Sequence, residues 1–297
     1  MSRFDAQFAG RLDGQTVLVT SAKGGIGYET AQGAGNSGAT VLVHARRADY
    51  ARQAVDRLVS NGNGKGRYIP LAGDLGSLAG VRHLIDAVHQ VSPKGLYGLV
   101  NNAGAAFSTK ALSPDGYERT IAINHVALAA LTSGLLDLLR KGADDFASPS
   151  RVVNMTAVIE SRGNLITDWS YPGKFKQIQA YADAKLLALM YTYAQARRHE
   201  GEGLTFNAVS PGAVKTTLGS KAGGPFKIIQ ALTNPFIRPP EKGSRGCVRL
   251  MADPMLATAT GGYYSSAKLK KSSEKSRNRD AQDRVYEQTE HELHSHN

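Results

Sequence analysis

The fold is decided by the stretch TVLVTSAKGGIG at residues 16–27, where an apolar, β-branched run passes into a glycine-rich turn. The run at residues 16–20 predicts a buried strand, and residues 26–35 predict the helix that follows the turn. Such a turn presents free backbone N–H groups and the positive end of a helix dipole to a pyrophosphate. The turn lacks the GxGxxG spacing and is a weak signal alone, but its place after a first strand predicts a dinucleotide-binding unit.

The same alternation of short β-branched runs and longer helical patterns continues along the chain, which predicts βαβ units. Further strands are expected at residues 40–44, 68–72, 97–101, 151–155, 204–209 and 262–265. Helices are expected at residues 50–59, 77–91, 117–139, 178–199 and 244–252. The strands are apolar nearly throughout, as in a sheet covered on both faces. We therefore predict an α/β fold, a Rossmann-type doubly wound parallel sheet of about seven strands with helices on both faces.

Length and composition fit one large α/β domain. The chain has 297 residues, of which 41% are hydrophobic and 21% charged, as in an ordinary soluble protein. We expect a single domain over residues 1–297, with a basic C-terminal extension at about 266–297. Residues 219–240 are rich in glycine and proline and predict a mobile segment over a pocket.

The net charge of +11 points to anionic partners such as a phosphate-bearing cofactor. Much of the excess lies in KLKKSSEKSRNR at residues 268–279. We predict a solvated loop there and no nucleic-acid binding, because no aromatic residues interleave the charges. The closing His291, His294 and His296 predict a frayed tail rather than a metal site.

The single cysteine, Cys247, excludes an internal disulfide and suits a reducing compartment. Residues 1–11 contain no apolar stretch of the kind that signal peptides carry. No window approaches the run of about 20 apolar residues that a membrane span needs. We therefore expect a cytoplasmic protein without a membrane span.

The second predicted strand ends in HARR at residues 44–47, where a Rossmann unit reaches the adenosine ribose. An acidic residue there would hydrogen-bond the 2′-hydroxyl, whereas an arginine accommodates a 2′-phosphate. Arg46 and Arg47, with no acid beside them and Lys23 in the turn, favour NADP(H). The alternative is that both arginines only face solvent.

Ordered motifs along almost the whole chain resemble the short-chain dehydrogenase/reductase family. Residues 20–27 resemble its TGxxxGxG turn, with Ser21 in place of the first glycine. The other matches, in chain order, are Asp74 in AGDL, NNAG at residues 101–104, Asn124 in INH, Tyr181 and Lys185 as YxxxK, and Pro211-Gly212. GIGYETA at residues 25–31, Asp168-Trp169, and GYY at residues 262–264 before a charged helix ending at Leu293 resemble the retinol-dehydrogenase-like and WW-domain-oxidoreductase-like branch.

The turn, the end of the second strand and this resemblance together indicate where NADP(H) would bind. The expected cofactor-binding residues are Thr20, Ser21, Lys23, Gly25, Ile26, Gly27, Arg46, Arg47, Asp74, Leu75, Asn102, Ala103, Gly104, Tyr181, Lys185, Pro211 and Gly212. The resemblance implies that Asp74 contacts the adenine.

Tyr181 and Lys185 stand four residues apart on a predicted helix, so their side chains share one face. A nearby ammonium lowers the pKa of a phenol. A phenol tuned in this way can protonate a carbonyl oxygen as hydride reaches the carbon, or deprotonate an alcohol in reverse. The resemblance implies that Lys185 also holds the nicotinamide ribose and that Asn124 anchors a water relay to Lys185.

The family's third catalytic partner is a serine at the end of the fifth strand, and here Ala157 occupies that position in NMTA at residues 154–157. Thr156 is one residue early, and successive strand residues point to opposite faces. It can replace the serine only if the strand bulges or ends there, while Ser161 lies in the following loop. Losing such a donor costs about 2.7–4 kcal/mol of transition-state stabilisation.

These residues favour an NADP(H)-dependent oxidoreductase that reduces a carbonyl or oxidises an alcohol on a small, apolar substrate. The substrate expectation rests on the branch resemblance and on Phe226, Ile228, Ile229, Leu232 and Phe236 in the predicted mobile segment. Ala157 leaves two alternatives open, namely non-redox chemistry such as dehydration or cyclisation, and a catalytically weakened NADP(H)-binding protein. Related folds pair through the helices expected at residues 117–139 and 181–199, which allows a homodimer or homotetramer.

Overall fold

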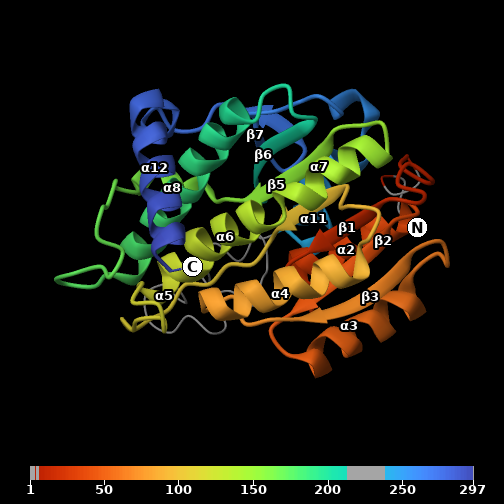
Figure 1. Ribbon diagram of the computed structural model, residues 1–297, viewed down its shortest axis with the longest axis horizontal. Helices are drawn as coiled ribbons and strands as arrows, with labels where there is room; N and C mark the ends of the chain where they lie inside the picture. The colour runs from red at the N-terminus through yellow and green to blue at the C-terminus, as the bar shows by residue number, and fades with distance from the viewer. Residues whose placement is uncertain (1–3, 5–6, 213–237, 297) are drawn as a thin grey trace.

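The computed structural model describes residue 4 and residues 7–212 and 238–296 (Figure 1). Its centre is an eight-stranded sheet in the order β3-β2-β1-β4-β5-β6-β7-β8. The strands are β1 (Thr16–Val19), β2 (Thr40–Ala45), β3 (Arg67–Ala72), β4 (Gly98–Asn101), β5 (Ser150–Met155), β6 (Leu204–Ser210), β7 (Tyr263–Ser265) and β8 (Lys268–Lys270). All neighbours pair in parallel except β7 and β8, which are antiparallel. The predicted doubly wound parallel sheet is confirmed, with β8 as an addition at its edge.

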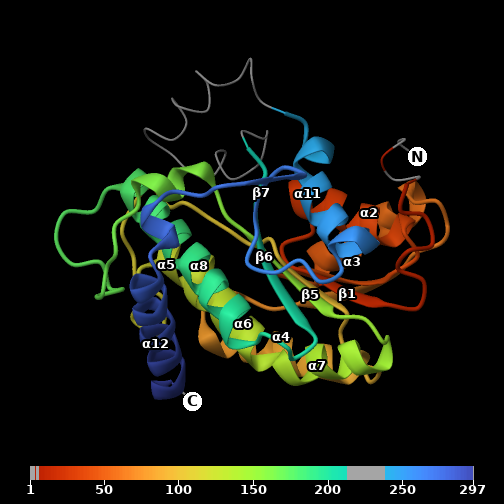
Figure 2. The ribbon, with the colours of Figure 1, turned by 90° about the horizontal axis from the view of Figure 1, so that it is seen from above.

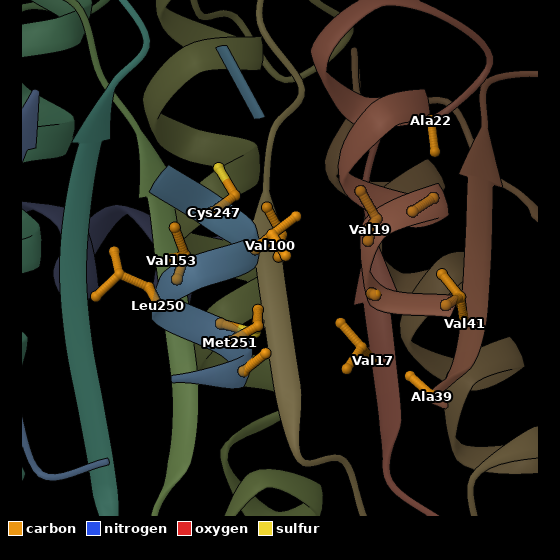
Figure 3. Close-up of a cluster of buried hydrophobic side chains, with 14 of the residues drawn as sticks. Val17, Val19, Ala22, Ala39, Val41, Val100, Val153, Cys247, Leu250 and Met251 are labelled. Carbon is orange, nitrogen blue, oxygen red and sulfur yellow. The ribbon is translucent and has the colours of Figure 1, made fainter. Parts of the chain in front are cut away.

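Helices cover both faces of this sheet (Figure 2). One face carries α2 (Gly25–Asn36), α3 (Ala48–Asn61) and α11 (Pro240–Ala252), and the other carries α4 (Leu78–Val91), α6 (Ala127–Gly134), α7 (Leu136–Asp145) and α8 (Gln177–Arg198). Val17 and Val19 of β1 pack with Leu250 and Met251 of α11 (Figure 3), whereas Leu18 between them faces the second core. The apolar strands therefore result from burial on both sides.

The strand order reverses between β1 and β4, so the carboxyl ends of these two strands open a crevice at the switch point. The glycine-rich turn follows β1, and the NNAG sequence begins at the end of β4. The fold therefore brings these two motifs together where such sheets bind ligands.

The single helix expected at residues 117–139 is wrong. The chain forms a short α5 (Arg119–Ile121), a π-helical turn η1 (Ala122–Val126), α6 and then α7, with a bend of 52° before α7. Leu135 leaves the helical conformation at the bend, and at Gly134 a Cβ atom would lie 2.4 Å from the Cδ1 of Ile85. A larger residue at Gly134 would therefore displace the Ile85 side chain of α4 at the point where the helix breaks.

No single helix within the described parts of the chain combines the length and apolarity that crossing a membrane requires. One bent pair, Arg119–Gly134 with Leu136–Asp145, would satisfy those two criteria together.

The segment expected as a solvated loop at residues 268–279 is mostly exposed, as expected, but it is not a loop throughout. The segment contains β8 and the 3-10 turn η5 (Lys275–Arg277), and it leads into α12 (Arg279–Ser295), which packs against α8 (Figures 1 and 2). The buried residues Ala281, Val285, Thr289 and Leu293 recur every fourth position and form its packing stripe. His291 and His294 are therefore part of a packed helix rather than a frayed tail.

The remaining short elements are the 3-10 turns η2 (Val158–Arg162) and η4 (Pro254–Leu256). η2 follows Ala157, and its buried Glu160 accepts hydrogen bonds from the amide and the hydroxyl of Ser273, at 3.0 and 2.6 Å. The basic C-terminal segment therefore anchors the turn that begins beside Ala157.

Candidate active site

The glycine-rich turn and the NNAG loop are hydrogen-bonded to each other. The hydroxyl of Thr20 accepts from the amides of Asn102 and Ala103, at 2.9 Å each, and the Asn102 side chain donates to the Thr20 carbonyl at 2.9 Å. At Gly27 a Cβ atom would lie 2.4 Å from the Asn102 Nδ2 and 2.6 Å from the Ser21 carbonyl oxygen. Only glycine fits there. The expected residues of both motifs therefore form one cradle that fits a pyrophosphate.

Ser21, which stands where the family has glycine, has a left-handed backbone conformation with φ of 54°. A non-glycine residue pays about 1–2 kcal/mol for this conformation. The amide of Ser21 donates to the Nδ1 of His44 at 3.1 Å, and the amide of Ala22 donates to the His44 carbonyl at 2.8 Å. The end of β2 therefore holds the strained turn in place.

His44 is a residue of the site that the sequence did not lead us to expect. It is buried, its Nδ1 accepts from Ser21, and its Nε2 lies 2.9 Å from the carbonyl oxygen of Gly73, directly before Asp74. Because Nδ1 accepts, Nε2 carries the proton and donates to Gly73. Burial lowers the pKa of His44 to about 4, so the ring is neutral near pH 7. The one signal in the sequence was a histidine closing the otherwise apolar run TVLVH.

We expect His44→Phe to weaken the binding of NADPH and NADH alike, by about 5- to 150-fold, because two polar backbone groups lose their partner at about 1–3 kcal/mol. The ratio of the two affinities should stay unchanged, because His44 lies away from the group that distinguishes the cofactors. Calorimetric titration measures both constants, with His83→Phe on the exposed face of α4 as the control. Loss of NADPH affinity alone would contradict this role.

The free energy of unfolding should fall as the pH drops from about 6.5 towards 4, because two histidines are buried in neutral form. Burial lowers the pKa of His44 to about 4 and that of His125 to about 3, both from 6.5. The unfolded chain therefore binds more protons in this window, and the stability present above pH 6.5 is lost on acidification. His44 contributes about 2–3 kcal/mol between pH 7 and pH 4.5. Urea unfolding at both pH values checks this, and an equal pH dependence in His44→Phe would contradict the assignment.

Cations gather where the adenosine end of a dinucleotide would lie. Arg46 is exposed, and Arg47 is bound by Asp49 through its Nε and Nη2 at 3.0 and 2.9 Å. The Nζ of Lys23 lies 4.1 Å from the ring centroid of Tyr50. With Asp49 paired to Arg47 and Asp74 nearby, the three cations outnumber the two carboxylates, so the surface beside the end of β2 keeps a positive charge that suits a phosphate.

Asp74 and Leu75 follow β3 in this same region. Asp74 is exposed, and its Oδ1 accepts from the amide of Gly76 at 3.0 Å, whereas Leu75 is buried. The structure places Asp74 beside the Gly73 carbonyl that His44 binds. The glycine-rich turn, the end of β2 and the residues after β3, which were all expected around the adenosine, are therefore neighbours.

Tyr181 and Lys185 are buried on one face of α8, as expected. The Lys185 Nζ lies 5.7 Å from the Tyr181 ring centroid and donates to the Met155 carbonyl at 2.8 Å. Burial lowers the pKa of Lys185 to about 8 and raises the pKa of Tyr181 above its usual value. The expected lowering of the phenol pKa is therefore wrong, and Tyr181 retains the proton that a general acid donates.

Asn124 lies in the π-helical turn η1, a feature that often marks functional positions. Its Nδ2 donates to the carbonyls of Ala105 and Thr120, at 2.6 and 2.7 Å, while its buried Oδ1 has no partner among the described residues. A Cβ atom on Gly104 would lie 2.9 Å from this Oδ1 and 3.5 Å from the Lys185 Nζ. The three residues therefore meet around a polar spot with a free acceptor, which fits a water relay.

Ala157 stands in an extended conformation at the start of η2, and the hydroxyl-bearing residues Thr156 and Ser161 flank it in the sequence. The Thr156 hydroxyl is buried and directed at the Lys185 carbonyl oxygen, at 3.5 Å. Ser161 is exposed, and its hydroxyl donates to the Val158 carbonyl at 3.0 Å. Both hydroxyls are thus engaged with backbone, and a catalytic role for Thr156 stays a prediction.

The remaining expected features lie at the end of β6 and beyond. Pro211 follows β6, and Gly212 has a φ of 75° that favours glycine. Of the predicted mobile segment at residues 219–240, residues 219–237 lie outside the described residues. They include its five apolar residues. Within residues 7–212 and 238–296, no three His, Cys, Asp or Glu side chains gather as metal ligands would.

Comparison with known proteins agrees with this geometry. The family described as short chain dehydrogenase matches residues 15–224. Retinol dehydrogenase 14 of Homo sapiens is 31% identical over 276 residues, covering 87% of this chain and 80% of the relative. The WW domain-containing oxidoreductase of Danio rerio is 29% identical over 264 residues, covering 86% and 62%. The solved Pseudomonas aeruginosa RhlG/NADP active-site complex is 27% identical, with a TM-score of 0.69, and covers 89% of this chain and 97% of that one.

Proposed function

The chain belongs to the short-chain dehydrogenase family, and from this membership we propose an NADP(H)-dependent oxidoreductase that interconverts a carbonyl and an alcohol on a small, apolar substrate. The observation that carries the proposal is the meeting of Tyr181, Lys185 and Asn124 beside the NNAG loop. A glycine-rich turn without this group would support cofactor binding alone.

Each residue has a distinct part in the proposed reduction. A bound nicotinamide supplies the hydride that reaches the carbonyl carbon. Tyr181 donates its phenolic proton to the carbonyl oxygen, so the substrate gains one hydride and one proton. The Lys185 ammonium stabilises the phenolate that remains. The free Oδ1 of Asn124 fixes a water through which Lys185 and the phenolate are reprotonated. The oxidation of an alcohol follows the same path in reverse.

The preference for NADP(H) over NAD(H) is the finer part of the proposal. Its support is the exposed Arg46 beside Lys23 and Arg47, with Asp49 as the acidic neighbour of Arg47. Arg47 already shares its guanidinium with Asp49, which leaves Arg46 to bind a 2′-phosphate in the bidentate manner that suits arginine.

We expect Arg46→Ala to weaken NADPH binding by about 10- to 150-fold, the value of a hydrogen bond to a charged group at 1.5–3 kcal/mol. NADH affinity should change by less than about threefold, because NADH lacks the phosphate. Calorimetric titration of both cofactors checks the ratio. Arg47→Ala is the matched control and should lose less, because Arg47 is held by Asp49. An unchanged ratio in Arg46→Ala would refute this assignment.

The proposal of an apolar substrate rests on relatives and on the surface near Ala157. Five of the similar proteins are named retinol dehydrogenase, and retinol is an apolar alcohol. Val158, directly after Ala157, is 60% exposed, and Leu165 in the next loop is 42% exposed. Exposed apolar side chains beside a catalytic centre suit an apolar ligand.

Ala157 also supports two alternatives. With no hydroxyl at this position, the site suits non-redox chemistry such as dehydration or cyclisation, or a weakened NADP(H)-binding protein. Product analysis distinguishes them: conversion without net NADPH consumption identifies the first, and NADPH binding without conversion identifies the second.

We also propose that the protein forms a homodimer or homotetramer and that it lies in the cytoplasm. The expected pairing face on α8 is covered by α12, where Tyr191 donates to Glu290 at 2.6 Å and the Nε2 of His125 lies 2.9 Å from the Thr289 hydroxyl. An interface on this side would therefore be built on α12.

A further inference from the structure

Gln177, the first residue of α8, is a buried amide that the proposed mechanism does not use. It is 7% exposed, and its Nε2 donates to the carbonyl oxygen of Ala106 at 3.5 Å. Its Oε1 is buried and has no partner among the described residues. Because only the NH₂ group can face a carbonyl, the contact with Ala106 fixes which way the amide points. The free atom is therefore an acceptor, and buried acceptors are normally paired.

Gln177 also lies on the catalytic face of α8. Gln177, Tyr181 and Lys185 follow one another at intervals of four residues, so their side chains form one row along the helix. The loop after β4 runs beside this row in the opposite direction. Its Gly104 lies beside the Lys185 Nζ, and its Ala106 lies beside Gln177. Tyr181 stands between these two contacts, so Gln177 is one helical turn beyond Tyr181, on the side away from Lys185.

We propose that the Gln177 Oε1 recognises the substrate by accepting a hydrogen bond from a hydroxyl or N–H group near the reacting carbonyl. This rests on the proposed function, in which Tyr181 binds the carbonyl oxygen. Side chains four residues apart have Cβ atoms about 5–6 Å apart. Because Gln177 and Tyr181 stand on adjacent turns of one helix face, we place the donor within a few atoms of the carbonyl, as in a hydroxy ketone.

The hydrogen bond to Gln177 would partly compensate for the alanine at position 157. A serine there would hold the substrate oxygen, and Ala157 cannot. A hydrogen bond from the substrate to Gln177 fixes its orientation at another point and can supply part of the lost positioning. The preferred substrates are therefore apolar carbonyl compounds that carry one nearby hydrogen-bond donor.

The test compares ketones that differ at one position, in three pairs of increasing size: hydroxyacetone with butanone, α-hydroxyacetophenone with propiophenone, and benzoin with deoxybenzoin. Calorimetry measures binding to the protein with and without NADP⁺, and NADPH oxidation measures turnover. We expect the hydroxyl-bearing member to bind at least about tenfold more tightly in each pair that binds, as for a site built to pair with a hydroxyl. Gln177→Leu should reduce this preference to within about twofold without changing NADPH affinity.

Gln195 provides a matched control on the same helix. It is also buried with a partnerless Oε1, and it lies 18 residues further along α8, about 27 Å away at 1.5 Å per residue. Gln195→Leu removes the same kind of group and should keep the preference. Equal binding of both members of each pair, or no binding of any hydroxy ketone, overturns the inference. A preference in binding without NADPH oxidation would instead refute the oxidoreductase proposal and leave this inference standing.

Discussion

Tyr181→Phe should lower kcat for carbonyl reduction by about 100- to 10,000-fold, the range over which a positioned general acid contributes. The variant keeps the ring, which is buried on α8 above Lys185, and loses only the hydroxyl that donates the proton. NADPH affinity should fall by no more than about tenfold, because only one hydroxyl of the expected cofactor-binding set is lost and the cradle formed by Thr20 and Asn102 is untouched. Steady-state turnover and calorimetric titration of the same preparation check both values.

The matched control is Tyr193→Phe, three helical turns further along α8. Its hydroxyl donates to Ser272 at 2.8 Å, outside the catalytic row. The control loses one hydroxyl of the same kind and should retain turnover within about threefold. Unchanged turnover in Tyr181→Phe would refute the assignment of Tyr181 as the acid.

Ala157→Ser should raise kcat/KM by about 100- to 1,000-fold, because one hydrogen-bond donor to a developing oxyanion is worth that much. Ala157 has φ of −152° and ψ of 150°, an extended conformation that serine adopts without strain, and it is not fully buried. The new hydroxyl would lie at the position where the resemblance leads us to expect the catalytic serine. Initial rates with each ketone pair described above measure the gain.

Val158→Ser places a hydroxyl one residue further on, at an exposed position, and should give no gain. A gain in both variants would indicate a nonspecific effect of added polarity. No gain in Ala157→Ser, with intact NADPH binding, would favour non-redox chemistry or a binding protein over the weakened reductase.

Local patterns were sufficient to predict the sheet. The run TVLVT was expected as a strand over residues 16–20, and β1 extends from Thr16 to Val19. Apolar runs buried on both faces have few alternative structures, because strand, turn and helix signals agree. The glycine-rich turn and the NNAG loop were both expected to bind the cofactor, and the structure brings them together because both follow parallel strands that end at one edge of the sheet.

The errors concern contacts between segments far apart in the chain. His44 bridges Ser21 and Gly73 through its side chain, and the sequence shows only a histidine at a strand end. The helix breaks after Gly134, where Ile85 of another helix comes close. The closing histidines were expected in a frayed tail, yet the stripe that includes Val285 packs α12 against α8. Tertiary packing overrides local propensity at each of these places.

The pKa of Tyr181 was mispredicted for a related reason. The expected lowering considered only the charge on Lys185, whereas the structure buries both groups, and burial opposes the charged form of each. The burial of these two groups depends on how α8 packs, and the four-residue spacing of Tyr181 and Lys185 in the sequence does not reveal that packing.

The most direct test of the central claim is calorimetric titration of the purified full chain with NADPH and, separately, with NADH. The site formed by Thr20, Asn102 and Arg46 predicts NADPH binding in the micromolar range and NADH binding at least about tenfold weaker, the value of one charged hydrogen bond. Failure of both cofactors to bind would mean that Ser21 has disabled the turn, and it would contradict an oxidoreductase function for this protein.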